Sequence, residues 1–197
     1  MHASARALAG ADYANGRSAI EAAMKGSHRV PGAADRDKYR HPAETLEFFG
    51  FTPTMTVLDI APGAGWYTEL LAPALAKHGT YITTVTDPRE SSGSNWGTSL
   101  SQSFVSLLDE APELCGKVHR IVVTYETPKL DLDGTVDMVL MMRQLHMMKN
   151  WGTLDAWLRI SHRALSPAGL WASRTIARHR MRIQSSVRPR GICPSRG

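Results

Sequence analysis

A glycine-containing turn, Ala61-Pro-Gly-Ala-Gly65, lies between an apolar segment and a helical pattern. Glycine has no Cβ, so the backbone of such a turn can approach a ligand closely. The helix that follows directs unpaired N–H groups and the positive end of its dipole toward the same place. The turn therefore predicts a ligand site, and by itself it suits either a dinucleotide or an adenosyl compound.

An acidic residue beside the turn discriminates between these two ligand classes. Asp59 stands two residues before the turn, where its charge would repel a pyrophosphate but could pair, directly or through water, with an ammonium group. The dinucleotide pattern G-x-G-x-x-G also requires a third glycine, and Thr68 occupies that position. S-Adenosylmethionine has an ammonium, a sulfonium and no phosphate, so an acid here favours it as the ligand.

A second acid follows the next apolar segment. Asp87 is placed where a carboxylate could accept hydrogen bonds from both ribose hydroxyls, with ordinary turn chemistry before Pro88 as the alternative. Trp66, at the start of the helix, could stack on the cofactor or the substrate, or simply pack. The combined spacing of acid, turn, helix, strand and second acid favours a nucleoside site over coincidence.

Two further polar residues, Arg143 and His146, follow the apolar segment 136–142. If that segment is a strand, both residues lie past its carboxyl end, the edge where open parallel sheets bind ligands. His146 could act as a general base for a hydroxyl or nitrogen acceptor, or orient one, with a local hydrogen bond as the alternative. The two cysteines are isolated from each other and indicate neither a disulfide framework nor a metal site.

Hydrophobic periodicity predicts the elements that position these groups. Residues 55–60 form a short β-branched run typical of a buried parallel strand. Residues 66–76 have helical spacing and 81–85 a second strand pattern, so the turn belongs to a βαβ unit. The other predicted elements are helices at 35–50, 99–108 and 151–165 and strands at 118–125 and 136–142. This alternation predicts an α/β fold with a doubly wound, mostly parallel sheet.

Composition divides the chain into three predicted parts. Residues 1–34 are rich in Ala, Gly and Ser and are expected to form a flexible arm, with a short helix near 18–24. Residues 35–169 contain the α/β domain. Residues 170–197 have neither helical nor strand periodicity and are expected to form a disordered basic tail.

The net charge of +5 belongs to the tail and not to the domain. Residues 171–197 contain seven arginines and no acid, which leaves 16 basic and 18 acidic side chains in residues 1–170. A basic face for phosphates is normally distributed through the fold, so we expect a small-molecule substrate, with nucleic-acid binding by the tail as an alternative. No apolar run could span a membrane and no signal peptide is recognisable, so the expected location is cytoplasmic.

The segment Asp59-Ile-Ala-Pro-Gly-Ala-Gly65 resembles the first motif of class I S-adenosylmethionine-dependent methyltransferases, D/E-x-G-x-G-x-G, with Ala61 in place of the first glycine. More narrowly, residues 40–50 (RHPAETLEFFG) and 62–73 (PGAGWYTELLAP) resemble a bacterial group of predicted methyltransferases. Arg143-Gln-Leu-His146 is similar to a later segment of that group, with Gln144 in place of asparagine.

This resemblance covers residues 35–169 and implies a Rossmann-like fold with S-adenosylmethionine as the cofactor. The implied cofactor contacts are Asp59, Ala61, Gly63, Gly65 and Asp87, and we add Trp66 as a candidate. The methyl group of Ala61 is expected to weaken cofactor binding unless the backbone there keeps a negative φ. A nicotinamide-dependent oxidoreductase is the alternative enzyme class.

The C-terminal residues do not continue the resemblance. A class I fold supplies a fifth strand after residue 169, whereas residues 171–197 have the composition of GC-rich DNA translated in another frame. One permitted codon set, read two bases over, gives segments that resemble the missing part. We therefore expect a truncated or frameshifted chain in which the strand at 136–142 has no neighbour and the catalyst is weak or inactive.

Overall fold

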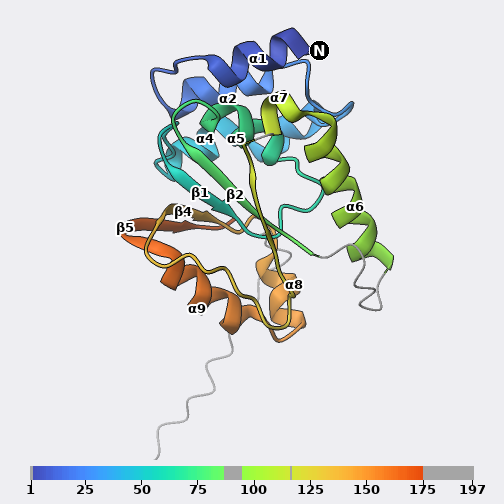
Figure 1. Ribbon diagram of the computed structural model, residues 1–197, viewed down its shortest axis with the longest axis vertical. Coiled ribbons are helices and arrows are strands. Elements are labelled where there is room, and N and C mark those ends of the chain that lie inside the picture. The colour runs from blue at the N-terminus through green and yellow to red at the C-terminus, as the bar shows by residue number, and fades with distance from the viewer. Residues whose placement is uncertain (1, 87–94, 116, 175–197) are drawn as a thin grey trace, which may run out of the picture.

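The computed structural model describes residues 2–86, 95–115 and 117–174. Five parallel strands form one sheet in the order β3-β2-β1-β4-β5 (Figure 1). The strands are β1 (Thr56–Asp59), β2 (Thr80–Val85), β3 (His119–Val122), β4 (Val136–Leu140) and β5 (Leu165–Ala172). The helices are α1 (His2–Gly10), α2 (Gly16–Met24), α3 (Asp37–Arg40), α4 (Pro42–Phe48), α5 (Thr68–Leu75), α6 (Asn95–Glu110), α7 (Pro112–Cys115), α8 (Leu145–Asn150) and α9 (Leu154–Ala164), with a 3-10 turn at Ala34–Arg36. The predicted doubly wound parallel sheet is confirmed.

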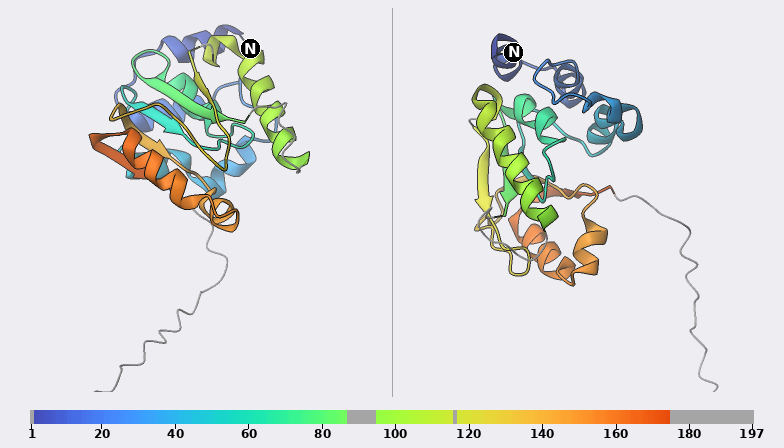
Figure 2. Two further views of the ribbon diagram at one scale, coloured as in Figure 1. Left: turned by 60° about the horizontal axis from the view of Figure 1, so that its bottom comes forward. Right: turned by 90° about the vertical axis from the view of Figure 1, so that its right-hand side faces the viewer.

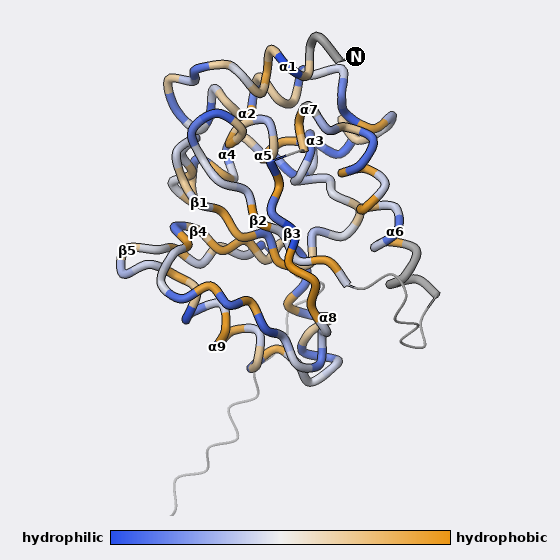
Figure 3. Tube along the Cα trace, viewed as in Figure 1, coloured by the Kyte–Doolittle hydropathy of each residue, from blue (hydrophilic) through white to orange (hydrophobic). Residues whose placement is uncertain are grey.

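Helices cover both faces of the sheet. In Figure 1, α1, α2, α4, α5 and α7 lie on one side, and α8 and α9 lie on the other. On the face covered by α5, Val57 and Tyr81 belong to one apolar cluster with Leu70. On the opposite face, Leu58 belongs to a second cluster with Trp157 of α9. Successive strand residues point to opposite faces, so both faces need apolar side chains. Figure 3 shows the central strands as a hydrophobic part of the trace.

The strand order reverses beside β1. From β1 the chain first builds outward through β2 and β3, and it then returns to add β4 and β5 on the other side of β1. Asp59, the last residue of β1, pairs with Thr83 of β2 and with Leu140 of β4. In open α/β sheets, ligands usually bind beside such a reversal, outside the carboxyl ends of the two strands that flank it, which are β1 and β4 here.

The predicted helix at 35–50 is divided into shorter pieces. His41 adopts a left-handed conformation (φ 44°) immediately before Pro42, which starts α4. Proline disfavours helical backbone in the residue that precedes it, and this explains the break. The apolar side chains of α4 differ in burial, because Leu46 is buried but the Phe48 side chain is 85% exposed. The break leaves Arg40 at the end of α3, close to the edge of the sheet that carries the turn.

The expectation of a flexible arm at residues 1–34 is wrong for the described residues 2–34. Helix α2 begins with a capping box, in which Ser18 N donates to Asn15 Oδ1 at 2.8 Å and Asn15 N donates to Ser18 Oγ at 3.2 Å. Ile20 is fully buried where α2 packs against α4 and α5. Gly16 permits a close approach, since a Cβ there would lie 2.0 Å from the carbonyl oxygen of Phe51. The right-hand view of Figure 2 shows these N-terminal helices stacked above the rest of the fold.

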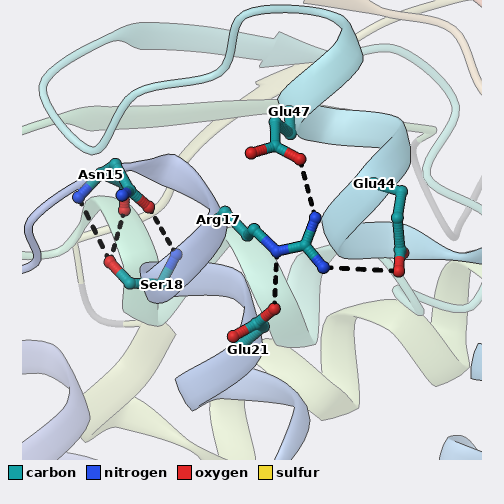
Figure 4. Close-up of polar contacts among 6 residues, drawn as sticks. All are labelled: Asn15, Arg17, Ser18, Glu21, Glu44 and Glu47. Carbon is teal, nitrogen blue, oxygen red and sulfur yellow. Dashed lines mark hydrogen bonds and ion pairs between the residues drawn. The ribbon is translucent and has the colours of Figure 1, made fainter.

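Arg17 connects α2 to α4 at the surface (Figure 4). Its Nε lies 2.8 Å from Glu21 Oε1, its Nη1 2.8 Å from Glu47 Oε2 and its Nη2 3.6 Å from Glu44 Oε1. Ion pairs as exposed as these contribute at most about 1 kcal/mol each. The buried apolar side chains of α2 and α4, among them Ile20 and Leu46, are therefore expected to stabilise the contact more than this cluster does.

The expectation that the strand at 136–142 lacks a neighbour is also wrong. Strand β5 runs parallel to β4 and pairs Leu170, Trp171 and Ala172 with its last three residues. The register shifts between Val136 and Met138, which accommodates the irregular sequence at 166–169. The expected domain boundary at residue 169 therefore lies inside a strand. Residues 175–197, with the other six arginines of the basic segment, lie outside the described residues.

No helix within the described ranges has the length and apolar character needed to cross a membrane.

Candidate functional site

Asp59 ends β1 as a buried carboxylate, with only 2% of its surface exposed. Tyr81 Oη donates a hydrogen bond to Asp59 Oδ2 at 2.7 Å, and Thr68 Oγ1 lies 2.9 Å from the same hydroxyl. Burial raises the pKa of Asp59 to about 7, and the hydrogen bond from Tyr81 opposes this rise. Because desolvation disfavours the charged form, a cation placed beside Asp59 would restore its ionisation.

Hydrogen bonds from two directions hold the turn after β1. Ala61 N donates to Thr84 Oγ1 of β2 at 2.9 Å, and Gln144 Nε2 donates to Ala61 O at 2.8 Å. The backbone has positive φ at Ala61 (55°), Gly63 (66°) and Gly65 (83°). Ala61 therefore does not keep the negative φ that would have made its methyl group harmless, and its methyl group is still expected to weaken cofactor binding.

The two glycines of the turn have different surroundings. A Cβ on Gly63 would meet no atom within 4 Å. A Cβ on Gly65 would lie 2.5 Å from Leu107 Cδ2 and 2.9 Å from Phe104 Cδ2, both on α6. Gly63 thus leaves space on the open side of the turn, whereas Gly65 allows α6 to pack against it. The sequence had assigned both glycines to ligand approach, and only Gly63 has the open surroundings which that role requires.

Trp66 is directed toward the N-terminal segment. Its Nε1 donates to Ala33 O at 2.9 Å, and the guanidinium carbons of Arg40 and Arg29 lie 4.3 and 5.4 Å from its ring centroid. Cation–π contacts of this kind fix the position of a guanidinium over an aromatic face. Trp66 therefore acts as a support for Arg40, and a direct contact with the cofactor stays a prediction.

A pocket of about 540 Å³ opens at this edge of the sheet. It is lined by Arg36, Tyr39, Arg40, Tyr67, Met142, Arg143 and Arg174, and we call it the arginine pocket. Tyr67 directly precedes α5, Met142 and Arg143 follow β4, and Arg174 follows β5. Segments far apart in the sequence thus meet at the carboxyl ends of the strands.

The arginines of this pocket are linked through the backbone. Arg174 Nη1 donates to Arg40 O at 2.6 Å and to Thr45 Oγ1 at 3.2 Å. Arg143 adopts a positive φ of 64°, and its N donates to Arg174 O at 2.8 Å. Burial lowers the pKa of Arg40, and the charges of Arg143 and Arg36 lower it further. The pocket therefore concentrates positive charge.

The structure brings only part of the predicted site together. Arg143 lines the arginine pocket, but His146 is exposed on α8 and does not line it. Asp87, expected at the ribose, lies outside the described residues. The sequence did not identify Arg36, Arg40 or Arg174 as site residues. The position of Arg40 could have been suspected from Pro42, which predicts a helix break just after Arg40. The position of Arg174 could not, because it depends on the formation of β5.

Comparison with known proteins gives a clear result for the fold. No family model matches the chain, and no curated protein matches it. A SAM-dependent methyltransferase from Aquifex aeolicus matches in structure with a TM-score of 0.55 and 22% identity, over 71% of this chain and 65% of that chain. The fold is that of the class I S-adenosylmethionine-dependent methyltransferases.

Two further solved structures share this methyltransferase fold. Coclaurine N-methyltransferase bound to N-methylheliamine and SAH matches with a TM-score of 0.52 and 17% identity, over 77% of this chain and 41% of that chain. A DhpI–SAM–HEP complex matches with a TM-score of 0.51 and 16% identity, over 88% of this chain and 73% of that chain. This chain spans less than two thirds of the length of the Aquifex enzyme and of coclaurine N-methyltransferase.

Proposed function

We propose that this chain binds S-adenosylmethionine at the Asp59–Gly65 turn and transfers its methyl group to a small-molecule acceptor. The observation that carries the proposal is the buried carboxylate of Asp59, whose pKa is raised to about 7, at the strand reversal of a methyltransferase fold. A carboxylate held in a desolvated position costs stability, and a cationic ligand would compensate that cost. The ammonium of S-adenosylmethionine is such a cation.

The residues around the turn fit this ligand by their chemistry. Asp59 would hold the ammonium group, directly or through water, and Gly63 leaves the open side of the turn free for close approach of the nucleoside. Asp87 would accept hydrogen bonds from the ribose hydroxyls. When bound, the cofactor supplies an electrophilic methyl group on a sulfonium.

The residues after β4 would serve the acceptor. Methyl transfer is a direct displacement, so the main task of the protein is to hold the nucleophilic atom in line with the methyl group. Arg143, in the arginine pocket, would orient the acceptor. His146 is exposed on α8 and would accept a proton from a hydroxyl or nitrogen acceptor that reaches it.

A nicotinamide-dependent oxidoreductase is the competing enzyme class. Its dinucleotide carries a pyrophosphate, which an ionised Asp59 beside the turn would repel. Thr68 replaces the third glycine of the dinucleotide pattern, and its hydroxyl contacts that of Tyr81 inside the core. Both observations support the methyltransferase proposal.

Calorimetric titration tests the proposal. We expect S-adenosylmethionine and S-adenosylhomocysteine to bind the full chain and NADH not to bind. Asp59→Asn should weaken S-adenosylmethionine binding by about tenfold or more, since one charge-assisted contact contributes roughly 1.5–3 kcal/mol. Asp155→Asn is the matched control, because Asp155 is exposed on α9 and pairs only with Arg159 among the described residues. Binding of NADH, or equal affinities for both variants, would contradict the proposal.

A further inference from the structure

We infer that the arginine pocket binds the methyl acceptor through an anionic group, a carboxylate or a phosphate. The inference deepens the proposed function and rests on it for the identification of the ligand as an acceptor. The four pocket arginines supply planar, permanently charged donors, and guanidinium groups match the oxygen pairs of carboxylates and phosphates. A neutral acceptor would not require this concentration of charge.

The positive charge of the pocket is not neutralised by the protein. Within residues 2–86, 95–115 and 117–174, none of the four arginines forms an ion pair, and no carboxylate lines the pocket. Asp37, which acts on Arg40 electrostatically, is already paired with Arg29 at 2.6 Å. Like charges held together destabilise the folded chain. An anion in the pocket would relieve this repulsion.

The position of the pocket assigns the anion to the acceptor. Asp59 and Gly63 mark the cofactor side, at the end of β1, whereas Arg143 and Arg174 follow β4 and β5 on the other side of the strand reversal. Tyr67, which directly precedes α5, lines the pocket on the side of the turn. The cofactor carries a single carboxylate, whose one negative charge would balance only one of the four arginines. The excess charge is therefore available to a second ligand.

Two of the four arginine side chains, those of Arg40 and Arg174, are held in place before any ligand binds. Arg40 lies against the Trp66 ring at 4.3 Å, and its carbonyl oxygen accepts a hydrogen bond from Arg174. Arg143 keeps its strained positive φ with its backbone N bonded to Arg174 O. Non-glycine residues in this conformation persist where the surroundings enforce it, and they concentrate at functional sites. Preorganised donors lose less entropy on binding.

Calorimetry at low salt, with S-adenosylhomocysteine at saturation, tests the inference. The probes are benzoate, phenyl phosphate and the neutral benzyl alcohol. We expect at least one of the two anions to bind and benzyl alcohol not to bind, and the tighter anion identifies the preferred group. Arg143→Gln should weaken anion binding by about tenfold, as expected for loss of a charge-assisted contact. Arg163→Gln, on the exposed face of α9, should leave it within about twofold, because that side chain pairs with Asp133.

A second variant separates loss of the site from loss of the fold. The Arg36 side chain is exposed and makes no hydrogen bond within the described ranges, so Arg36→Gln should fold normally and still weaken anion binding. The inference is overturned if neither anion binds, if Arg143→Gln and Arg36→Gln both bind the anions like the parent, or if an anion binds only when S-adenosylhomocysteine is left out. Anion binding without S-adenosylmethionine binding would remove the proposed function and leave an anion site. Cofactor binding without anion binding would remove only this inference.

Discussion

Replacement of Asp59 by asparagine should stabilise the folded chain at neutral and alkaline pH. Asparagine has nearly the same shape and keeps an oxygen that can accept the hydrogen bond from Tyr81 Oη. It removes the cost of ionising a buried acid. In the parent protein the pKa of Asp59 rises from 3.8 to about 7, because burial disfavours the carboxylate.

The sign follows from proton linkage. Between the two pKa values the folded state binds a proton more tightly than the unfolded chain, so the free energy of unfolding falls as the pH rises from about 4 to about 7. At about 1.4 kcal/mol for each pKa unit, the complete loss is about 4 kcal/mol. Between about pH 5 and about pH 8, the parent should lose about 2.5 kcal/mol that Asp59→Asn does not lose.

Urea unfolding at these two pH values, followed by tryptophan fluorescence, measures the effect. Asp155→Asn is the control for loss of one acid, because its side chain is 84% exposed. Burial also raises the pKa of Glu69, but that group is present in parent and variant and cancels in their difference. A difference between parent and Asp59→Asn that is the same at both pH values would refute the reasoning.

Three other experiments, with five substitutions in all, test the turn and the N-terminal helices. Ala61→Gly should bind S-adenosylmethionine up to about tenfold more tightly in calorimetry, because it relieves the methyl group at φ 55°; unchanged affinity would show that this methyl is harmless. Ile20→Ala should lower the free energy of urea unfolding by about 2–4 kcal/mol. Phe48→Ser should change the free energy of unfolding by less than about 0.5 kcal/mol, since Phe48 is 85% exposed. Equal effects of Ile20→Ala and Phe48→Ser would contradict the burial of Ile20 in the core. Gly65→Ala should lower the thermal midpoint more than Gly63→Ala, because both positions have positive φ but only Gly65 lies against α6; equal midpoints would contradict that contact.

Sequence patterns gave the central sheet correctly because its strands are short, apolar and separated by clear turns. Residues 55–60 and 81–85 show this pattern, and the acid before the glycine turn identified the carboxyl end of β1. The short helix predicted near residues 18–24 corresponds to α2, but α1 and the packing of these helices on the domain were missed, because a segment rich in Ala, Gly and Ser has few large apolar side chains. Their stability comes instead from close packing, such as that of Gly16 against Phe51.

The C-terminal strand and the arginine pocket depend on contacts that local patterns do not show. Residues 166–169 interrupt the strand pattern with Ser-Pro-Ala-Gly, and pairing with β4 decides the structure there. Arg174 reaches the pocket only because β5 forms. Arg40 reaches it because His41 breaks the helix. Only Arg143 was identified, because it directly follows a strongly apolar strand.

The affinity for S-adenosylmethionine as a function of pH tests the central claim most directly. If the Asp59 carboxylate holds the cofactor's ammonium group, its protonation below a pKa of about 7 must weaken binding. We expect the dissociation constant to be about tenfold higher at about pH 6 than at about pH 8, with no such change in Asp59→Asn. An affinity for the parent protein that is independent of pH over this range would contradict the assignment of Asp59 to the cofactor.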